Sequence, residues 1–342
     1  MSVLHLLGTA GEGGAETYFV DLVQALNRTG LTEACALRGN ATREALLKRA
    51  GVAVKVLRFG GPIDILTRPA VRRFARMTDT QVAVAWMNRA ARHTPTGPWA
   101  RVGRLGGYYN LKYYKDFDHL VANTEDIADW IVGQGWPAGR VTCIPNFAAA
   151  PQDGTGVDRG SLTTPAGAPL LLAMGRLHDN KAHDVSLQAL VQIPDAYLWI
   201  AGVGPMEGKL RGLAEALGVT DRVRFLGWRT DASALYRTAD VCMFPSRYEP
   251  LGNVVIQAWA HGLPVVAASS QGPGALIREG EDGLLVPVDD PDALARGVRR
   301  LLAEPALGNR LAAAGTARVA AEFSEAAVVD QWKNLFADFG AA

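Results

Sequence analysis

Short apolar runs alternate with stretches of helical periodicity along almost the whole chain. Residues 15–27, for example, place apolar side chains at the spacing of one helix face, directly after a first apolar run. Runs of this kind predict buried strands in the first half at 3–8, 34–37, 52–57, 82–86, 120–123 and 141–144. Strands that alternate with helices favour parallel sheets covered by helices on both faces.

The alternation breaks at residues 148–169, where small, polar, glycine and proline residues predict a domain linker followed by a surface loop. A second series then begins, with strands expected at 170–174, 197–201, 223–226, 241–244, 265–268 and 283–286. Helical patterns close the chain at 291–303, 306–322 and 328–339. We therefore predict an α/β protein with two domains, 1–150 and 151–325, and a separate C-terminal helix within 326–342.

The composition is that of a soluble globular protein, with 49% hydrophobic and 20% charged residues among 342. No apolar run is long enough to span a membrane, and the first residues lack the basic region and cleavage site of a signal peptide. Cys35, Cys143 and Cys242 are odd in number and far apart, which argues against a disulfide framework or a zinc site. These features indicate a reducing compartment, and we expect a cytoplasmic protein.

The net charge of +1 conceals an asymmetry between the two halves. The first 150 residues carry an excess of about six positive charges, and the remainder carries an excess of about five negative charges. Within the first half, Arg72, Arg73 and Arg76 have spacings that can share one helix face, and aromatic residues are interleaved with further cations. This pattern predicts docking on an anionic membrane surface. A solvated basic face, or a pocket for a soluble anionic acceptor, would also explain it.

Four segments of the second half follow predicted strands, at the edge of a parallel sheet where ligands bind. The first places Arg176 and Lys181 after Gly175, in a loop that enters a helix. A guanidinium and an ammonium at this spacing suit the negative charges of a pyrophosphate. Two solvated surface cations are the alternative interpretation.

The second and third segments are less specific. Gly202 and Gly204 come directly after a strand and let the backbone pass close to a ligand, although a tight turn would explain them too. The next strand ends near Leu226 and Trp228, where main-chain groups can meet the flat edge of a nucleobase. An ordinary strand end is the alternative there.

The fourth segment is the most informative. A strand ends at Phe244, a loop rich in proline and glycine carries Glu249, and a helix is expected to start near residues 251–253. N–H groups at a helix start are free to bind a phosphate. Glu249 can accept hydrogen bonds from sugar hydroxyls, and Gln257 can reach a ribose from the helix. A helix-terminal charge and a solvated amide are the alternative, but the joint order of the four segments favours a ligand site.

Taken together, these segments resemble the retaining glycosyltransferases of family 4, which have the GT-B architecture. That family shares a Gly-Arg…Lys pair, a Gly-x-Gly-Pro turn, a Phe-Leu-Gly strand end and a Pro-Ser…Glu-Pro…Gly loop, all of which occur here. The resemblance covers nearly the whole chain, but its specific motifs lie in the second half. It implies two Rossmann-like, doubly wound parallel-sheet domains that face a cleft, with a C-terminal helix crossing back to the first domain.

The resemblance also assigns roles to individual residues. Arg176 and Lys181 are expected to neutralise the donor diphosphate, and Glu249 to hold hydroxyls of the donor sugar, so these are the expected catalytic residues. The N–H groups of residues 251–253 are expected to cradle the distal phosphate. The other expected donor-binding residues are Gly13, Gly14, Gly175, Gly204, Leu226, Trp228, Leu251, Gly252, Asn253 and Gln257.

Two of these positions need comment. Gln257 stands where the family has a second glutamate that binds ribose; an amide can still bond a diol, but it carries no charge. Gly13, Gly14 and Glu16 match the family's Gly-Gly-x-Glu loop, which reaches the donor across the cleft. A dinucleotide fingerprint competes for the same loop, but Glu16 occupies its third glycine position and the second strand ends in Arg38 instead of an acidic residue.

The catalytic base is not evident. Many relatives carry a histidine after the strand near residues 100–106, and this chain has none there. Retaining enzymes of this architecture are thought to use the donor phosphate to deprotonate the acceptor, so the protein would position the reactants and stabilise charge on the leaving diphosphate. No metal cluster is evident, and neither a metal nor another cofactor is expected. The residues expected on the acceptor or membrane side are Arg72, Arg73, Arg76, His93, Tyr108 and Tyr109.

The sequence therefore predicts a retaining, metal-independent hexosyl transfer to a hydroxyl of a lipid-linked or cell-envelope glycan. A UDP-sugar donor is favoured and a GDP-sugar is possible. The expected partners are this donor, the acceptor and an anionic membrane; no nucleic acid is expected. The expected location is the cytoplasm, at the cytoplasmic face of the inner membrane. Two alternatives stay open: a nucleotide-sugar epimerase, which would need its own acid and base carboxylates in the first domain, and a nucleotide-sugar-binding protein without catalysis.

Overall fold

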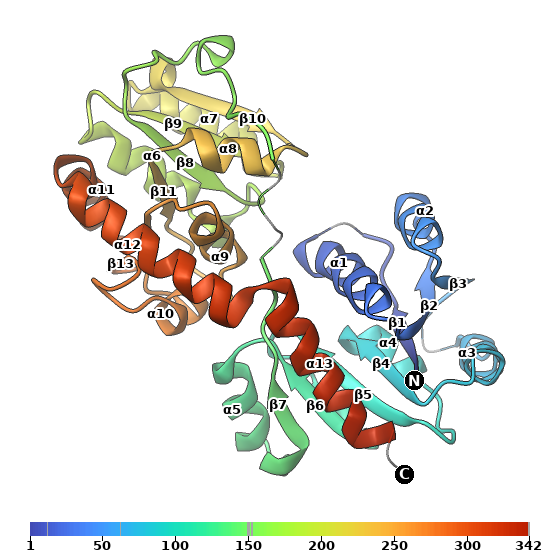
Figure 1. Ribbon diagram of the computed structural model, residues 1–342. Coiled ribbons are helices and arrows are strands. Elements are labelled where there is room, and N and C mark those ends of the chain that lie inside the picture. The colour runs from blue at the N-terminus through green and yellow to red at the C-terminus, as the bar shows by residue number, and fades with distance from the viewer. Residues whose placement is uncertain (12, 62, 149–150, 152, 341–342) are drawn as a thin grey trace. The chain divides into compact units, whose positions relative to one another are not determined.

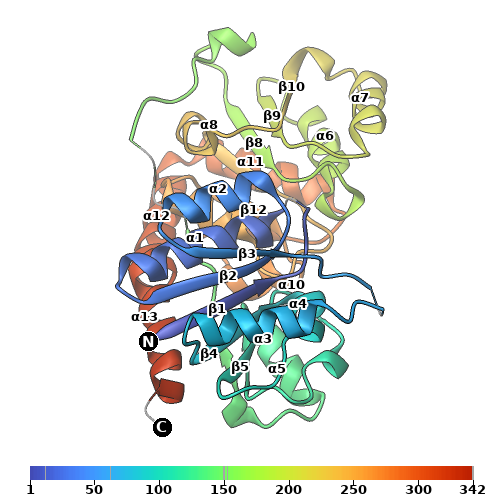
Figure 2. The same ribbon diagram turned by 90° about the vertical axis from the view of Figure 1, so that its right-hand side faces the viewer.

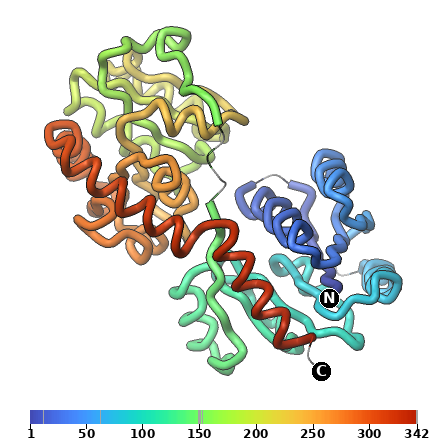
Figure 3. The backbone as a smooth tube through the Cα atoms, in the orientation of Figure 1, coloured from blue at the N-terminus to red at the C-terminus, as the bar shows by residue number. Residues whose placement is uncertain are grey.

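The computed structural model describes all residues except 12, 62, 149–150, 152 and 341–342. The chain forms two compact units. Unit 1 consists of residues 1–146 together with the C-terminal segment from Glu325, and unit 2 of residues 147–324. The chain passes between them at 146–147 and again at 324–325, as the trace in Figure 3 shows. Part of the expected linker, residues 149–150 and 152, lies outside the described residues.

Unit 1 is built on a parallel sheet of seven strands in the order β3-β2-β1-β4-β5-β6-β7. Its strands are β1 (Ser2–Leu7), β2 (Thr32–Arg38), β3 (Ala53–Leu57), β4 (Val82–Trp86), β5 (Ala100–Leu105), β6 (His119–Ala122) and β7 (Val141–Cys143). Because the order reverses between β1 and β4, the loops after these two strands diverge at the carboxyl edge and leave a crevice there.

Helices cover this sheet on both faces. Along β1, Leu4 and Leu6 join the core beneath α3, α4 and α5, whereas His5 points the opposite way and packs edge-on against Phe19 of α1. The C-terminal helix α13 lies beside α1, and its Trp332 is fully buried (Figure 1). The helices of unit 1 are α1 (Gly14–Arg28), α2 (Ala41–Arg49), α3 (Thr67–Met77), α4 (Met87–His93), α5 (Glu125–Gly133) and α13 (Glu325–Gly340), and Figure 2 shows α3 and α4 together.

Unit 2 repeats the design with a parallel sheet of six strands in the order β10-β9-β8-β11-β12-β13. Its strands are β8 (Leu170–Met174), β9 (Tyr197–Ala201), β10 (Val223–Gly227), β11 (Val241–Phe244), β12 (Val265–Ala268) and β13 (Leu284–Val286). Here the order reverses between β8 and β11, so the crevice of unit 2 is expected beside the loops after these strands.

Two apolar cores lie on the two faces of this sheet. One joins α6, α7, α11 and α12 to the strands, and the other joins α8, α9 and α10. The helices of unit 2 are α6 (His183–Val191), α7 (Glu207–Ala216), α8 (Ala232–Thr238), α9 (Asn253–Ala260), α10 (Gln271–Leu276), α11 (Pro291–Ala303) and α12 (Pro305–Arg318). A wider π-helical turn, Val319–Phe323, follows α12.

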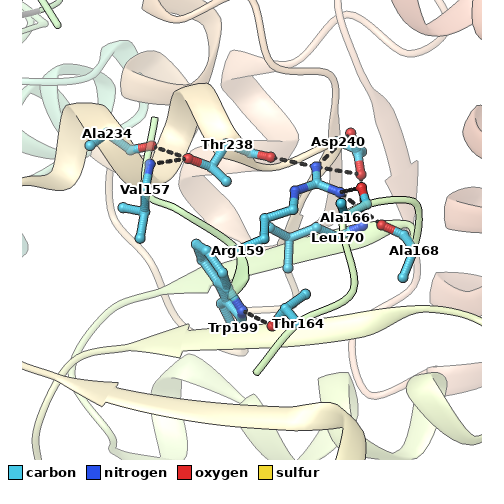
Figure 4. A network of polar contacts seen from close by, with 10 residues as sticks. All are labelled: Val157, Arg159, Thr164, Ala166, Ala168, Leu170, Trp199, Ala234, Thr238 and Asp240. Atoms are coloured by element: carbon cyan, nitrogen blue, oxygen red, sulfur yellow. Dashed lines mark hydrogen bonds and ion pairs between the residues drawn. The ribbon is translucent and has the colours of Figure 1, made fainter. Parts of the chain in front are cut away.

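A polar network fixes the amino ends of β8 and β11 (Figure 4). The guanidinium of Arg159 donates to the Asp240 carboxylate at 3.1 Å, to the Thr238 carbonyl oxygen at 2.7 Å and to the Ala168 carbonyl oxygen at 2.8 Å. The same carboxylate accepts from the Leu170 amide at 2.7 Å. The two strands that flank the reversal are therefore tied together at the end opposite the candidate site.

The structure confirms the expected fold class. The strands expected at 82–86, 170–174 and 241–244 agree with β4, β8 and β11 to the residue. One strand of the sheet, β5, was absent from the hydrophobic pattern because arginine and glycine interrupt its apolar run. All three cysteines are free; Cys35 and Cys242 are buried and Cys143 is partly exposed. None of the described helices has both the length and the apolar character needed to cross a membrane.

One carboxyl group at the contact between α1 and α13 makes stability depend on pH. Burial, and then the charge of Glu325, raise the pKa of Asp21 to about 6 from its ordinary value of 3.8, while Arg28 opposes this shift. A carboxyl whose folded-state pKa is raised weakens the fold once it ionises, so this penalty is present above about pH 6 and disappears as the pH falls toward 4.

We therefore expect Asp21→Asn to raise the free energy of unfolding by about 1 kcal/mol near pH 7.5 and by almost nothing near pH 4. Urea unfolding at the two pH values measures this difference. Asp330→Asn, at an exposed position of α13, is the matched control and should change little at either pH. If Asp21→Asn raised the free energy of unfolding equally at both pH values, the raised pKa of Asp21 would be contradicted.

Candidate active site

The four segments singled out in the sequence lie side by side along one edge of the sheet of unit 2. They follow β10, β9, β8 and β11, which are neighbours in that order, and parallel strands all end at the same edge. The reversal falls between the last two, so the loop after β8 and the loop after β11 face each other across the crevice. The structure thus gathers residues that are up to about eighty positions apart in the sequence.

The loop after β8 supplies the positive charges. It leaves the strand at Gly175, whose φ of +146° lies in a region that favours glycine, and ends in a short 3₁₀ turn, Asp179–Lys181. The Lys181 ammonium forms an ion pair with Glu249, and the two side chains are only 24% and 13% exposed. Arg176 is exposed, and its guanidinium contacts no carboxylate within the described part of the chain.

The loop after β11 holds Glu249 from several sides. The Gly252 amide donates to its carboxylate at 3.4 Å, and the Gly272 amide, from the start of α10, donates to its main-chain oxygen at 2.7 Å. A Cβ atom at Gly272 would come within 2.6 Å of that oxygen, so only glycine fits. No local signal in the sequence distinguishes Gly272 from an ordinary glycine.

Arg247 joins the two loops. Its main-chain amide donates to the Asn180 carbonyl oxygen at 2.8 Å, and its guanidinium bonds both carboxylate oxygens of Asp184, at 3.0 and 2.6 Å. It also pairs with Asp289. These hydrogen bonds, that to Asp184 first, raise the pKa of Arg247 above its ordinary value, so its charge is permanent. Arg247 therefore sets the spacing between the loop that carries Lys181 and the loop that carries Glu249.

The glycines after β9 pack against the loop after β8. A Cβ at Gly202 would lie 1.9 Å from the Gly175 carbonyl oxygen, and one at Gly204 would lie 2.3 Å from the Leu177 carbonyl oxygen. The Leu177 amide donates to the Val203 carbonyl oxygen at 3.1 Å. These contacts show that the Gly-x-Gly turn lets two loops touch through their backbones, and thereby fixes the position of Arg176.

The segment after β10 lies at the outer end of this edge of the sheet. The strand bulges between Phe225 and Gly227, and the Gly227 carbonyl oxygen accepts from the Gly202 amide at 2.9 Å. Trp228 follows with 65% of its surface exposed, and Leu226 is partly exposed. An exposed tryptophan offers a flat apolar surface to a ligand.

Helix α9 presents its N-terminus to the same region. Gly252 adopts a left-handed conformation with φ of +94° directly before the helix, and it is buried together with Leu251. The first N–H groups of a helix have no carbonyl partner one turn earlier, so those near Asn253 can bind an anion. Gln257 lies one turn further on the same face and is partly exposed.

One buried group near these loops was not anticipated. His183 begins α6, two residues after Lys181, and its ring is buried close to the main chain of Gly175 and Arg176. Burial lowers its pKa to about 4; the main chain of Gly175 opposes this shift, and the charge of Lys181 adds to it. His183 is therefore neutral at physiological pH and adds no charge to the site.

The remaining expected residues belong to unit 1. Gly13 and Gly14 stand at the start of α1, and Glu12 of the same motif lies outside the described residues. Arg72, Arg73 and Arg76 are exposed on α3.

The other three residues expected on the acceptor side, His93, Tyr108 and Tyr109, differ in their surroundings. His93 is not a solvated loop residue, because it ends α4, is buried, and bonds the Gly60 carbonyl oxygen at 3.1 Å. Tyr108 hydrogen-bonds Asp126 and packs edge-on against Trp130. Tyr109 lines a pocket at the carboxyl edge of the sheet.

The arrangement in unit 2 suits a phosphorylated sugar. Lys181, Arg176 and the N–H groups at the start of α9 can share the charge of a diphosphate, and a bound diphosphate would compete with Glu249 for Lys181. Glu249 could then accept hydrogen bonds from hydroxyl groups. Among the described residues, no three histidine, cysteine, aspartate or glutamate side chains are grouped to hold a metal ion.

Comparison with known proteins gives the same picture. The family described as "Glycosyl transferases group 1" matches residues 168–304. Lipopolysaccharide core biosynthesis glycosyltransferase LpsE of Rhizobium meliloti is 36% identical over 333 residues, which cover 95% of this chain and 96% of that protein. LpsD of the same organism is 36% identical over 340 residues, with 98% of each covered.

Among solved structures, HepE of Anabaena in complex with UDP superposes with a TM-score of 0.85 at 20% identity, covering 99% of this chain and 100% of that one. At this identity the likeness shows the fold alone. The sequence relatives, in contrast, are similar over nearly their whole length, and they confirm the family expected from the motifs.

The packing of the loops after β8 and β9 generates a prediction. Gly204→Ala should lower the free energy of unfolding by about 1–3 kcal/mol, because its Cβ would overlap a backbone oxygen that cannot move aside easily. Gly208→Ala, in the first turn of α7, is the matched control: nothing lies within 4 Å of its Cβ, and alanine favours a helix. Melting temperatures compare the two variants. Equal melting temperatures would show that the two loops are not in backbone contact.

Proposed function

The chain belongs to the group 1 family of glycosyl transferases, and on this basis we propose that it transfers a hexose from a UDP-sugar, with retention of configuration, to a hydroxyl of a lipid-linked or cell-envelope glycan. The single observation that carries the proposal is the Lys181–Glu249 pair at the strand reversal of unit 2. It places a cation for the diphosphate beside a carboxylate for the sugar. The relatives LpsE and LpsD are named for lipopolysaccharide core biosynthesis, which supports the acceptor class.

In this proposal the donor diphosphate lies between the loop after β8 and the start of α9. Arg176 and Lys181 stabilise the charge that develops on the leaving diphosphate, a task in which fixed cations act without a metal ion. The N–H groups at the start of α9 bind the distal phosphate. Glu249, released from Lys181, orients the donor sugar through its hydroxyls. Gln257 bonds the ribose without adding negative charge near the phosphates.

The UDP preference is also a proposal, and two observations support it. The exposed Trp228 and the main-chain groups at the end of β10 offer a surface for a base. The solved structure of HepE, which has the same fold, contains UDP. A GDP-sugar is the alternative donor, and a direct binding comparison decides between them.

An experiment separates binding from transfer. Arg176→Ala and Lys181→Ala should each weaken UDP binding by about 1.5–3 kcal/mol, because each removes a charged partner of the diphosphate. Glu249→Gln should keep UDP binding within a few-fold while transfer falls strongly. Calorimetry with UDP and GDP measures the first effect, and release of UDP from UDP-sugars in the presence of a cell-envelope lipid extract measures the second.

Arg222→Ala is a control outside the site, since this residue bonds main-chain oxygens at the far end of the sheet. Unchanged UDP affinity in both cation variants would refute the diphosphate site. Tight UDP binding with no transfer to any acceptor would instead favour a binding protein without catalysis.

We further propose that unit 1 docks on an anionic membrane at the cytoplasmic face, where a lipid-linked acceptor resides. Helix α3 buries Val71 and Ala75 and exposes its arginines to solvent. Within the described residues, none of these arginines pairs with a carboxylate. They are Arg68, Arg72, Arg73 and Arg76.

The loop before α3 adds an apolar element. Ile63, Ile65 and Leu66 are 90%, 78% and 63% exposed, which is unusual for large apolar side chains. Asp64 holds this loop in shape by accepting hydrogen bonds from Gly60 and Thr67, and the bonds from Thr67 and Gly60 keep the pKa of Asp64 well below its usual range. Exposed apolar side chains next to unpaired arginines suit the interface of an anionic bilayer.

Co-sedimentation with vesicles tests the docking. Each cation near an anionic leaflet contributes about 1 kcal/mol, so replacing Arg72, Arg73 and Arg76 by Glu should abolish binding to vesicles with anionic lipid. Added salt should weaken binding of the unaltered protein. The control replaces Arg296, Arg299 and Arg300 on α11 of unit 2, which have the mirrored spacing, and should leave binding intact. Equal binding to neutral and anionic vesicles, or none to either, would contradict docking and leave the transferase proposal standing.

A further inference from the structure

The strand reversal of unit 1 also has a pocket beside it, and the sequence motifs did not identify it. The cavity measures about 420 Å³ and lies at the carboxyl ends of β1, β2 and β4. Its walls include Arg38 at the end of β2, Asn88 and Arg89 at the start of α4, and Tyr109. Because open parallel sheets bind ligands at this position, the pocket is a candidate site in its own right.

Among the described residues, the side chains of Arg38 and Arg89 form no hydrogen bond or ion pair, and no described aspartate or glutamate lines the pocket. Arg38 also lines a second cavity, which contains Asp64, but the oxygens of Asp64 accept hydrogen bonds from the loop before α3. A concave surface with two unpaired guanidinium groups attracts an anion.

A third guanidinium group stacks on one of the residues that line the pocket. Arg104 is buried, its Nε atom has no partner among the described groups, and it stacks 5.0 Å from the ring of Trp86, which lines the pocket. Its hydrogen bond goes to the neutral side chain of Asn146. Burial lowers the pKa of Arg104, and Tyr18 and Tyr109 partly oppose this shift. Arg104 therefore adds a third guanidinium group close to the lining of the pocket.

The backbone around the pocket is shaped for close approach. Met87, between β4 and α4, adopts a left-handed conformation with φ of +63°, which is uncommon for a residue with a side chain. A Cβ at Gly8 would come within 3.1 Å of the Ala90 amide, so glycine lets α4 approach the end of β1. Asn88 and Arg89 line the pocket, and the side-chain Oδ1 of Asn88 is buried without a hydrogen-bond partner among the described residues.

We propose that this pocket binds an anionic group of the acceptor sugar, a carboxylate or a phosphate, through Arg38 and Arg89. The inference rests on the proposed transferase function and narrows its acceptor to an acidic saccharide. The Asn88 side chain adds a neutral hydrogen bond to the sugar, and Tyr109 offers its ring to an apolar face of the saccharide. Arg104 makes no direct contact and acts through its charge.

Three monosaccharide probes test the pocket: glucuronate, glucose 6-phosphate and glucose. Their binding to the full-length protein is measured by saturation-transfer difference NMR with UDP present at saturation. We expect one or both acidic sugars to bind about tenfold or more tightly than glucose. Preference for glucuronate identifies a carboxylate acceptor and preference for glucose 6-phosphate a phosphorylated one. Glucose binding as tightly as both acidic sugars would overturn the proposal.

Arg38→Gln and Arg89→Gln should each weaken binding of the preferred acidic sugar about tenfold, while glucose binding and UDP affinity stay unchanged. Arg49→Gln, an exposed arginine at the end of α2, is the matched control and should have no effect. An equal loss in all three variants, or no loss in the first two, would overturn the proposal. So would a matching loss of UDP affinity, because the pocket would then belong to the donor. If the protein binds acidic sugars but not UDP, the pocket stands and the transferase proposal fails.

Discussion

The ion pair between Lys181 and Glu249 joins the two loops that face each other where the strand order of unit 2 reverses, and the neighbouring contacts hold its two ends. Taking two charges out of water is costly unless their geometry is fixed. Arg247 fixes the geometry of this ion pair because it bonds to both loops. Gly202, Gly204 and Gly272 also contribute, because their lack of a side chain lets neighbouring backbone segments touch. A diphosphate carries more charge than one carboxylate, so it can displace Glu249 from Lys181 and free it for sugar hydroxyls. In the proposed mechanism, this contact would exchange Glu249 for the diphosphate when the donor binds.

The two units share a topology but differ in the electrostatics of their crevices. In unit 2 Lys181 faces the carboxylate of Glu249, which partly balances the charge of the site. In unit 1 the described residues that line the pocket beside Arg38 and Arg89 carry no negative charge, so a positive potential is available to attract an anionic ligand. The same fold therefore offers a balanced site for a donor and an unbalanced one for an acidic partner.

Much of this organisation could be predicted from the sequence, for reasons that particular residues illustrate. β8, β9, β11 and β12 are short apolar runs with a proline, glycine or polar residue at one or both ends, so their limits could be predicted to the residue. In β5, Arg101 and Arg104 interrupt the apolar run, and its Gly103 leaves room for the ring of Tyr114, which only the folded chain reveals. The order of Arg176, Lys181 and Glu249 along the chain indicated a site for a sugar diphosphate, because the carboxyl ends of parallel strands lie at the same edge of a sheet. Arg247 could not be recognised, since its partners Asp184 and Asp289 lie 63 and 42 residues away.

The division of the chain between the units has a consequence for biosynthesis. Unit 2 is continuous, but unit 1 needs α13, whose Trp332 and Phe336 are fully buried against residues made some three hundred positions earlier. During translation the first 146 residues therefore emerge without the helix that completes their core, and they must wait while unit 2 is synthesised and can already fold. A ribosome that stalls after residue 324 would release a chain with a complete second unit and an exposed apolar surface on the first. A chain that lacks α13 is therefore expected to be recognised by chaperones and proteases more readily than one that contains it.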